Sequence, residues 1–441
     1  MKKIAKSRDG GQIKVAVVPH PQNVFPPTSG SVANVVWESA RRLASRCEVT
    51  IFSRRQARLE KFSLVQGVKI RRVAVKFDER VVLPIVRRLQ HYLALEKFFL
   101  FRFYFYLSFI IKTAFLIRRQ GCQIIHLHNY SQFAPVIRFF NPHGKIILHM
   151  HCHWLIEMDF KTVNRRLRCV DLIISPSDSI SEQTRRRFPE HASKCLTVPN
   201  GVDTSTFHRL QGEAVEAVRS SAGLNGKDVI LFVGRLTPEK GVHVLIEAMA
   251  TVRKMFPNAI LVLAGGEYFT PISAKVKTDL LYQQFENLKR NYHDYLNDLI
   301  ARYKLEAIFV GYQSQERLVH FYSLATLAVL PSFEEAGPLP VLEAMSCQLP
   351  IVATEADGIK DYLPPEAGFL VPLNDAPALA KSIVACLNDK KLREQMGQCG
   401  RQWVEAKFTW DRMAKTLLSV YTRLVLVPNL QEPVYEPEYA A

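Results

Sequence analysis

Two glutamates eight residues apart, Glu335 and Glu343, follow a short apolar run that predicts a buried strand. The first lies in a loop rich in glycine and proline, and the second falls in the first turns of the helix predicted after it. Free N–H groups at a helix start bind anions, and a nearby carboxylate accepts hydrogen bonds from sugar hydroxyls. The segment predicts a site for a phosphate joined to a ribose, although a plain amphipathic helix with solvated glutamates also fits it.

A second segment pairs two cations with two glycines. The apolar run 228–233 predicts a strand that ends at Gly234, where the backbone can approach a ligand closely. Arg235 and Lys240 flank the loop that follows, and an amphipathic helix begins after Gly241. Two cations at the carboxyl edge of a sheet suit a pyrophosphate, because charge-assisted hydrogen bonds are each worth about 1.5–3 kcal/mol. A solvated loop with stray cations is the alternative.

The two segments together resemble the motifs of retaining glycosyltransferases of family 4, which have the two-domain GT-B fold. In that family the string of Gly234, Arg235 and Lys240 binds the phosphates of a nucleotide-sugar donor. The resemblance further implies that Glu343 holds the ribose and that Glu335 lies close to the donor sugar. It covers most of the chain and is strongest in residues 197–372.

One position departs from the family pattern. Family members carry a glycine three residues after the first glutamate, where the backbone approaches the phosphate. Here that position is Pro338, and the glycine lies one residue earlier at Gly337. Proline has no N–H, so one expected donor is missing, and the resemblance leaves Gly337 and Leu339 as the donor-binding residues of this loop.

Three more glycosyltransferase-like positions come from other loops. The resemblance places the nucleotide base near Gly311 and Tyr312, at the end of the apolar run 307–312, where the family binds it largely through backbone atoms. In the first loop of the chain the family has a Gly-Gly pair that borders donor and acceptor. This sequence has Gly30-Ser31 there, and an ordinary strand-to-helix turn is the alternative.

Histidines alternate at the end of another predicted strand, at His149, His151 and His153. Alternating residues share one face of a strand, so a metal site is conceivable, but no carboxylate or cysteine pattern accompanies them. We predict instead that His151, with His153 as the second choice, lines the cleft near the donor sugar, as a comparable histidine does in the family. His126 and His128 alternate on the preceding strand and are predicted to be structural.

The order of elements predicts an α/β protein of the GT-B class, with two Rossmann-like doubly wound domains facing a central cleft. We place the N-terminal, acceptor-side domain at 1–199 and the nucleotide-sugar domain at 200–407, with the boundary at the Pro-Asn-Gly-Val-Asp string. Residues 408–427 are predicted to form a helix returning to the first domain, and 428–441 a disordered tail. Residues 267–305 form a connection longer than usual, to which the sequence assigns no role.

Charge is distributed unevenly along the 441 residues. The net charge is +17, yet residues 1–200 hold 34 Lys and Arg against 13 Asp and Glu, whereas the remainder holds 24 against 28. The basic N-terminal half predicts an anionic partner. Its segment 81–120 combines aromatic residues with Arg and Lys, and its longest uncharged run, 103–111, is too short to span a membrane. We predict contact with an anionic membrane surface, the alternative being a helix pair packed into the domain.

The eight cysteines are scattered without a Cys-x-x-Cys pair, and the first twelve residues lack an apolar core. We therefore expect reduced thiols and a cytoplasmic protein, peripheral at the inner face of the membrane. Basic residues are diffuse and no helix-turn-helix or zinc pattern occurs, so nucleic acid is not expected as a partner.

The predicted activity is transfer of a sugar, with retention, from a nucleotide-diphosphate donor to a saccharide or lipid-linked acceptor, in polysaccharide, lipopolysaccharide or glycolipid synthesis. No permanent cofactor is expected. No Asp-x-Asp motif occurs, and the paired cations predict a metal-independent reaction. Two alternatives remain at this point: a sugar-nucleotide epimerase of the same fold, and a non-catalytic module that binds membrane or nucleic acid.

Overall fold

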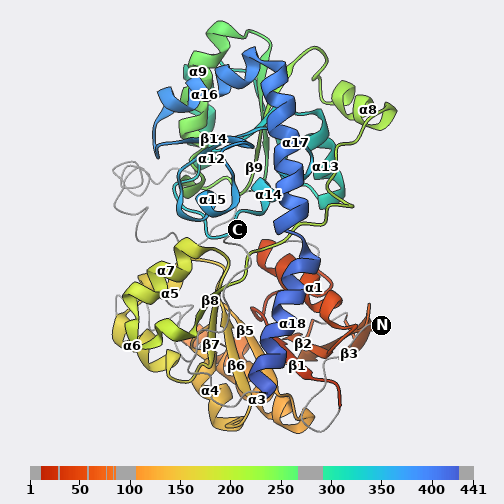
Figure 1. Ribbon diagram of the computed structural model, residues 1–441, viewed down its shortest axis with the longest axis vertical. Coiled ribbons are helices and arrows are strands. Elements are labelled where there is room, and N and C mark those ends of the chain that lie inside the picture. The colour runs from red at the N-terminus through yellow and green to blue at the C-terminus, as the bar shows by residue number, and fades with distance from the viewer. Residues whose placement is uncertain are drawn as a thin grey trace. The chain divides into compact units, whose positions relative to one another are not determined.

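The computed structural model describes residues 11–27, 30–56, 59–75, 77–82, 84–85, 106–266 and 292–426 (Figure 1). The chain forms two compact units: unit 1 contains the residues up to Pro199 together with those from Trp410 onward, and unit 2 contains Asn200–Thr409. Three predicted features lie outside the described residues: the aromatic stretch 86–105, the first part of the long connection, 267–291, and the tail from 427.

Unit 1 is built on a sheet whose strands, within the described residues, follow the order β3-β4-β2-β1-β5-β6-β7-β8. Every neighbouring pair is parallel except β3 with β4. Helices cover both faces of the sheet, and its parallel strands β1, β6 and β7 are accordingly mostly apolar and buried. The sequence did not predict the short strands β3, β4 and β8. The strands are β1 (Lys14–Val18), β2 (Glu48–Arg54), β3 (Phe62–Val65), β4 (Val68–Val73), β5 (Ile124–His128), β6 (Lys145–His149), β7 (Leu172–Ser175) and β8 (Cys195–Thr197).

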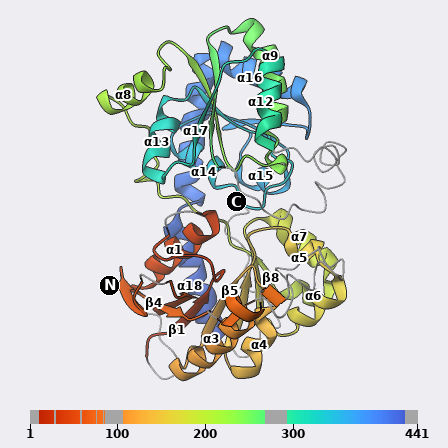
Figure 2. The same ribbon diagram turned by 180° about the vertical axis from the view of Figure 1, so that it is seen from behind.

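Helices of unit 1 pack on the two faces of this sheet. Helices α3 and α4 lie side by side, as Figure 2 shows, and their apolar residues join the core formed by Ala16, Ile125 and Leu148 of the sheet. The helical segments are α1 (Ser31–Leu43), η1 (Asp78–Val82), α3 (Leu107–Gln120), α4 (Phe133–Phe140), α5 (Trp154–Glu157), α6 (Phe160–Leu167), α7 (Asp178–Arg187), η3 (Pro189–Lys194) and α18 (Trp410–Leu426).

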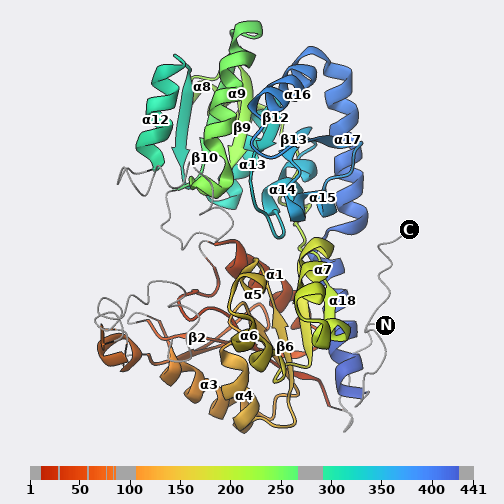
Figure 3. The same ribbon diagram turned by 90° about the vertical axis from the view of Figure 1, so that its left-hand side faces the viewer.

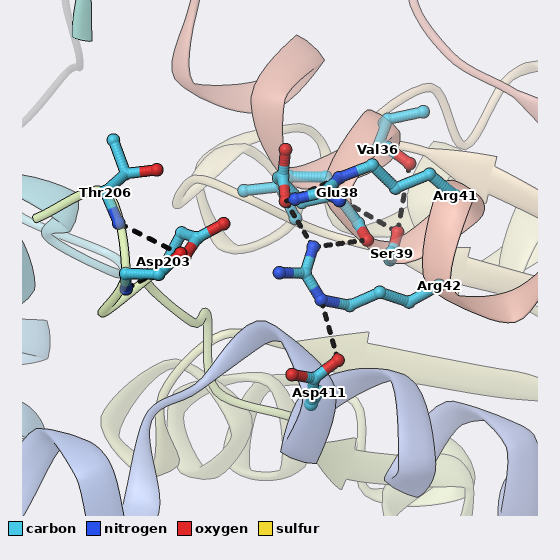
Figure 4. Close-up of polar contacts among 10 residues, drawn as sticks. Val36, Glu38, Ser39, Arg41, Arg42, Asp203, Thr206 and Asp411 are labelled. Carbon is cyan, nitrogen blue, oxygen red and sulfur yellow. Dashed lines mark hydrogen bonds and ion pairs between the residues drawn. The ribbon is translucent and has the colours of Figure 1, made fainter. Parts of the chain in front are cut away.

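Helix α18 belongs to unit 1 although it follows unit 2 in the sequence. Its buried residues Met413, Leu417 and Leu424 recur at helical spacing, so one stripe faces the unit. It packs against α1, where Arg42 donates from Nε to Asp411 Oδ1 at 2.9 Å (Figure 4). Asp411 is exposed, so this ion pair contributes at most about 1 kcal/mol, and apolar burial holds the helix.

Unit 2 contains a fully parallel sheet with the order β11-β10-β9-β12-β13-β14 within the described residues. The chain runs outward from β9 to β11, then returns to place β12 on the other side of β9. The direction of winding therefore reverses between β9 and β12, and such a reversal opens a crevice at the carboxyl ends of the two strands. The strands are β9 (Asp228–Val233), β10 (Ala259–Ala264), β11 (Ala307–Gly311), β12 (Leu327–Leu330), β13 (Ile351–Thr354) and β14 (Gly368–Val371).

The main core of unit 2 lies between its sheet and one layer of helices. Helix α9 packs against α12 and α16 in this layer (Figure 3), and α14 packs against α17 elsewhere in the unit. The helical segments are α8 (Glu213–Ser221), η4 (Pro238–Lys240), α9 (Val242–Met255), α12 (Tyr292–Arg302), α13 (Gln315–Leu324), α14 (Leu339–Ser346), α15 (Asp357–Tyr362), α16 (Ala376–Asn388) and α17 (Lys390–Lys407). Two Rossmann-like sheets confirm the predicted α/β class.

Candidate active site

Two loops meet at the carboxyl ends of β9 and β12 in unit 2, where the winding reverses. One is 234–241, before α9, and the other is 331–338, before α14. The peptide N–H of Phe333 donates to the carbonyl of Glu239 at 2.9 Å. Gly241 has φ +65°, and a Cβ there would lie 1.9 Å from the carbonyl oxygen of Pro331. Only glycine permits this approach, so Gly241 allows the two predicted motifs to touch.

The two predicted cations each face a carboxylate. Lys240 Nζ lies 2.6 Å from Glu335 Oε1, which joins the two loops, and Arg235 lies 3.2 Å from Glu239 across its own loop. Ser332 donates to Glu335 Oε1 at 2.9 Å. The side chains of Lys240 and Glu335 are 14% and 12% exposed, so this pair is poorly screened by water. The structure thus places Lys240 directly against Glu335, whereas Arg235 pairs with Glu239.

Glu343 lies in the second turn of α14 and is buried. Tyr322 of α13 donates its hydroxyl to Glu343 Oε2 at 2.9 Å. Burial raises the pKa of Glu343 to about 7, and the hydrogen bond from Tyr322 partly opposes that shift. Tyr322 therefore holds one of the two oxygens of the Glu343 carboxyl group.

The start of α14 shows how the chain accommodates its departure from the family pattern. Pro338 occupies the N-cap position and Leu339 begins the helix, with Pro340 next. Neither proline has an N–H, so Leu339 is the residue of these three that keeps a peptide donor. Asn200 donates from its side chain to the carbonyl of Gly337 at 3.0 Å, which fixes the loop from a segment far away in sequence.

Gly311 and Tyr312 lie at the end of β11, two strands from β9 along the same carboxyl edge. Gly311 has φ +67°, and its carbonyl accepts from Gly265 at 2.9 Å. Tyr312 is 51% exposed. Both residues therefore lie on the same carboxyl edge of the sheet as the two central loops.

The two remaining predicted residues lie in unit 1. Gly30 is the N-cap of α1 with φ +94°, a conformation that glycine adopts without strain. His151 follows the end of β6, partly buried, and its peptide N–H donates to Asn129 Oδ1 at 2.7 Å. Both residues follow strands of their own sheet at its carboxyl edge, but neither is part of the loop pair described above.

Four histidines of unit 1 form a stack of imidazole rings. His126 and His149 approach at 3.2 Å between ring nitrogens, and His128 and His151 at 2.9 Å. The rings within each pair are nearly parallel, at 8° and 6°, and one pair lies over the other. Tyr421 of α18 contacts the outer nitrogen of His126 at 2.6 Å. Burial holds the pKa of His126 and of His151 at about 3, so the stack is neutral at physiological pH.

The stack also contains the one group of possible metal ligands found among the described residues: nitrogens of His126, His128 and His149 within 4.8 Å of one another. Two histidines of this group also contact each other directly, since His126 Nε2 lies 3.2 Å from His149 Nδ1. The sequence suggested a different set of histidines, His149, His151 and His153. Strand β6 ends at His149, so the other two do not continue the alternation along the strand.

Sequence reasoning missed the residues that orient the predicted ones. Tyr322, Ser332 and Glu239 hold Glu343, Glu335 and Arg235. Tyr322 carries no signal in the sequence, because its role depends on the packing of α13 beside α14. Asn200 could have been found: it lies in the Pro-Asn-Gly-Val-Asp string, which was interpreted as a turn and a boundary.

The fold is that of an α/β protein with one mainly parallel sheet in each of two units. In unit 2, cations and carboxylates lie at the point where the winding of the sheet reverses. Two family models match the chain. The model described as Glycosyl transferases group 1 matches residues 215–403, and the model described as Glycosyltransferase Family 4 matches residues 32–206. The protein belongs to this superfamily of GT-B glycosyltransferases, and it is a glycosyltransferase enzyme. The predictions of family, fold and enzyme class are confirmed.

Similar proteins cover two thirds or more of the chain. Spore coat protein SA of Bacillus subtilis is 26% identical over 93% of this chain and 100% of its own length. Lipopolysaccharide 1,2-N-acetylglucosaminetransferase of Salmonella typhimurium is 26% identical over 67% and 71%. The Anabaena protein HepE, solved with UDP, has a TM-score of 0.68 at 16% identity and covers 92% of this chain and 98% of its own. Among the described residues no helix has the length and apolar character needed to cross a membrane.

Proposed function

We propose that the protein transfers a sugar from a nucleoside-diphosphate donor to an acceptor hydroxyl with retention at the anomeric carbon. The observation that carries the proposal is the joining of the two loops by Lys240 and Glu335 at the winding reversal of unit 2. A diphosphate would lie between the two cations and the start of α14. HepE, which shares the fold, was solved with UDP and with UDP-glucose, which supports a donor of this class.

Each residue takes a role from its position. Arg235 and Lys240 neutralise the charge that grows on the departing diphosphate, an electrostatic role that a metal fills in other enzymes. Glu343 accepts the ribose hydroxyls, and Glu335, held beside Lys240, lies at the donor sugar. Gly234, Gly337 and Leu339 offer close backbone approach to the phosphates, and Gly311 with Tyr312 meets the base.

Unit 1 supplies the acceptor side in this proposal. Gly30 and His151 border the acceptor. The leaving phosphate itself takes the acceptor's proton, so no separate base is required on that face. The relatives include an enzyme named for lipopolysaccharide and one named for a phosphatidylinositol mannoside, which supports a saccharide or lipid-linked acceptor.

Calorimetric titration with UDP, GDP and ADP tests the donor site. We expect one of them to bind with a micromolar Kd, unchanged by EDTA, because the cations supply the positive charge. The matching nucleotide sugar is then incubated with candidate acceptors and the product's anomeric configuration is read by NMR. Failure of all three nucleotides to bind at millimolar concentration contradicts the proposal. Turnover to free nucleotide and an epimerised sugar, with no acceptor, would support the epimerase instead.

A basic groove of about 250 Å³ in unit 1 supports the membrane setting of the proposal. None of the described residues that line it is acidic, and four of them are cations. Arg71 Nε is buried without a hydrogen-bond partner, and burial together with the nearby Arg119 lowers the pKa of Arg71. The groove therefore offers an excess of positive charge, although Glu60 lies near Arg72. It is lined by Lys61, Arg71, Arg72, Val73, Ala74, Lys112, Phe115 and Leu116.

Large apolar side chains surround these cations. Phe62 is 52% exposed, Leu64 70% and Phe115 50%. The guanidinium of Arg71 lies 5.0 Å from the ring centroid of Phe62. Cations beside exposed aromatic rings are typical of a surface that lies on anionic lipid, with the rings at headgroup depth.

Charge reversal in this groove should weaken vesicle binding. Each basic residue near an anionic surface contributes about 1 kcal/mol, so Lys61→Glu with Lys112→Glu is expected to weaken binding to phosphatidylglycerol vesicles at least about 30-fold. Both lysines are exposed, as are Lys381 and Lys415 of the matched control K381E/K415E. Cosedimentation measures the effect. Binding of the wild type to neutral vesicles at high salt, or equal loss in the control, would contradict the assignment.

A further inference from the structure

Tyr292 begins α12, the first described element after the long connection, and its hydroxyl reaches the start of α9. The oxygen lies 2.8 Å from His243 Nδ1 and 3.3 Å from the peptide nitrogen of His243. His243 is the second residue of α9, only three residues after Lys240. Both Tyr292 and His243 are buried, so these contacts form away from water, next to the loop that carries the two cations.

One of the two hydrogen-bond directions is fixed. The peptide N–H of His243 is one of the first donors of α9, which have no partner within the helix, and it donates to the Tyr292 oxygen. The direction of the second contact, between the Tyr292 hydroxyl and His243 Nδ1, depends on the imidazole tautomer. Burial raises the pKa of Tyr292 far above its usual range, so the hydroxyl keeps its proton at every working pH.

The imidazole connects this contact to the second loop. His243 and Phe333 lie ring over ring, with centroids 5.7 Å apart and planes at 12°. Phe333 donates its N–H to the carbonyl of Glu239 and lies two residues before Glu335. A continuous set of contacts thus runs from α12 through His243 and Phe333 to the loop that holds Glu335.

We infer that Tyr292 is a positioning residue for the diphosphate-binding loops: its hydroxyl, acting through His243, fixes the start of α9 and hence Lys240 relative to Glu335. The inference rests on the proposed function, because the ligand of these loops is the donor diphosphate. Tyr292 itself does not contact the reacting atoms. It keeps the loops in the binding geometry before the donor arrives, which lowers the cost of ordering them.

Tyr292→Phe removes one oxygen and leaves the ring that packs in the core. The variant is expected to raise the donor KM and the Kd of the bound nucleoside diphosphate about 10- to 100-fold, because small displacements of positioning groups have effects of that size. The acceptor KM should stay within about twofold. The matched control is Tyr303→Phe, the same chemical change at a residue 37% exposed, and it should leave both constants unchanged.

A second substitution separates positioning from general stability. If Tyr292 acts through His243, the effects of Tyr292→Phe and His243→Gln on the donor constants should not add, since both variants break the same contact. Donor constants within twofold of wild type, with only the melting temperature lowered, would overturn the inference. If Tyr292→Phe does not fold, the donor and acceptor constants of His243→Gln decide by the same criterion. A wild type that binds no nucleoside diphosphate and transfers no sugar would instead refute the proposed function.

Discussion

Replacing Arg235 and Lys240 together by alanine is expected to lower kcat/KM for the donor about 10²- to 10⁴-fold. Each cation makes a charge-assisted contact worth about 1.5–3 kcal/mol, and these contacts strengthen as charge builds on the leaving diphosphate. Two such losses sum to about 3–6 kcal/mol of transition-state stabilisation, which corresponds to the range given. Steady-state kinetics with the donor varied at saturating acceptor measures the change.

Stability must be separated from catalysis in this variant. Glu335 is largely buried against Lys240, so Lys240→Ala leaves a carboxylate without its counter-charge, which destabilises the fold. A companion variant, Arg235→Ala with Lys240→Met and Glu335→Gln, removes that carboxylate's charge as well. It should melt closer to wild type yet remain equally inactive.

The same unit offers a matched pair of cations for a control. Lys227 and Arg253 both contact Glu306, at 2.9 and 3.3 Å, and Lys227 precedes β9 at the opposite end of the strand from Arg235. Lys227→Ala with Arg253→Ala removes the same number of positive charges from the same unit. We expect it to keep kcat/KM within about twofold of wild type. Turnover of the Arg235/Lys240 variant within tenfold of wild type, at an unchanged melting temperature, would refute the electrostatic role.

The two central loops could be predicted because their information is local. Each has an apolar strand before it, glycine at the turn and a helix after it, so the sequence alone places Arg235 and Glu335 at strand ends. Alternation of strands and helices then predicts parallel sheets. That β12 lies beside β9, which brings Lys240 to Glu335, depends on the winding of the whole unit.

Contacts set by packing between distant elements left no readable signal. Tyr322 reaches Glu343 from another helix, and Tyr292 reaches His243 across 49 residues. Each is an ordinary tyrosine in an amphipathic helix, and its partner is fixed only when the helices pack. The carboxylates that pair with the two cations were missed for another reason. Glu239 lies within the motif itself, but the sequence does not show which carboxylate pairs with which cation.

The sequence predicted part of the arrangement of the histidines. Alternation placed His126 and His128 on one face of a strand, and that is where they lie. The register of β6 then sets His149 opposite His128, and Tyr421 closes the stack from a helix 295 residues away. The residue pattern of a single strand does not show which other strand and which helix pack against it. The stack of histidines could therefore be recognised only in the structure.

Acid should unfold unit 1 because of this stack. Burial holds the pKa of His126 and of His151 at about 3 and those of His128 and His149 well below the usual 6.5. The unfolded chain takes up these protons below about pH 6.5, whereas the folded chain does not, so stability is lost as the pH falls from 6.5 toward 3. Each such histidine lowers the free energy of unfolding by about 1.4 kcal/mol per pH unit in that window.

Urea unfolding between pH 7.5 and 4.5, followed by tryptophan fluorescence, measures this slope. His149→Gln removes one titrating group from the stack; it should be less stable than wild type at pH 7.5 and lose stability less steeply on acidification. Carboxylates that titrate in the same range contribute equally to both proteins and cancel in the comparison. His143→Gln, at an exposed position, is the matched control and should keep the wild-type slope. Equal slopes in wild type and His149→Gln would contradict the prediction. They would mean that water reaches the imidazoles and that they are protonated in the folded protein, because only groups whose pKa is lowered by burial make the protein less stable as the pH falls.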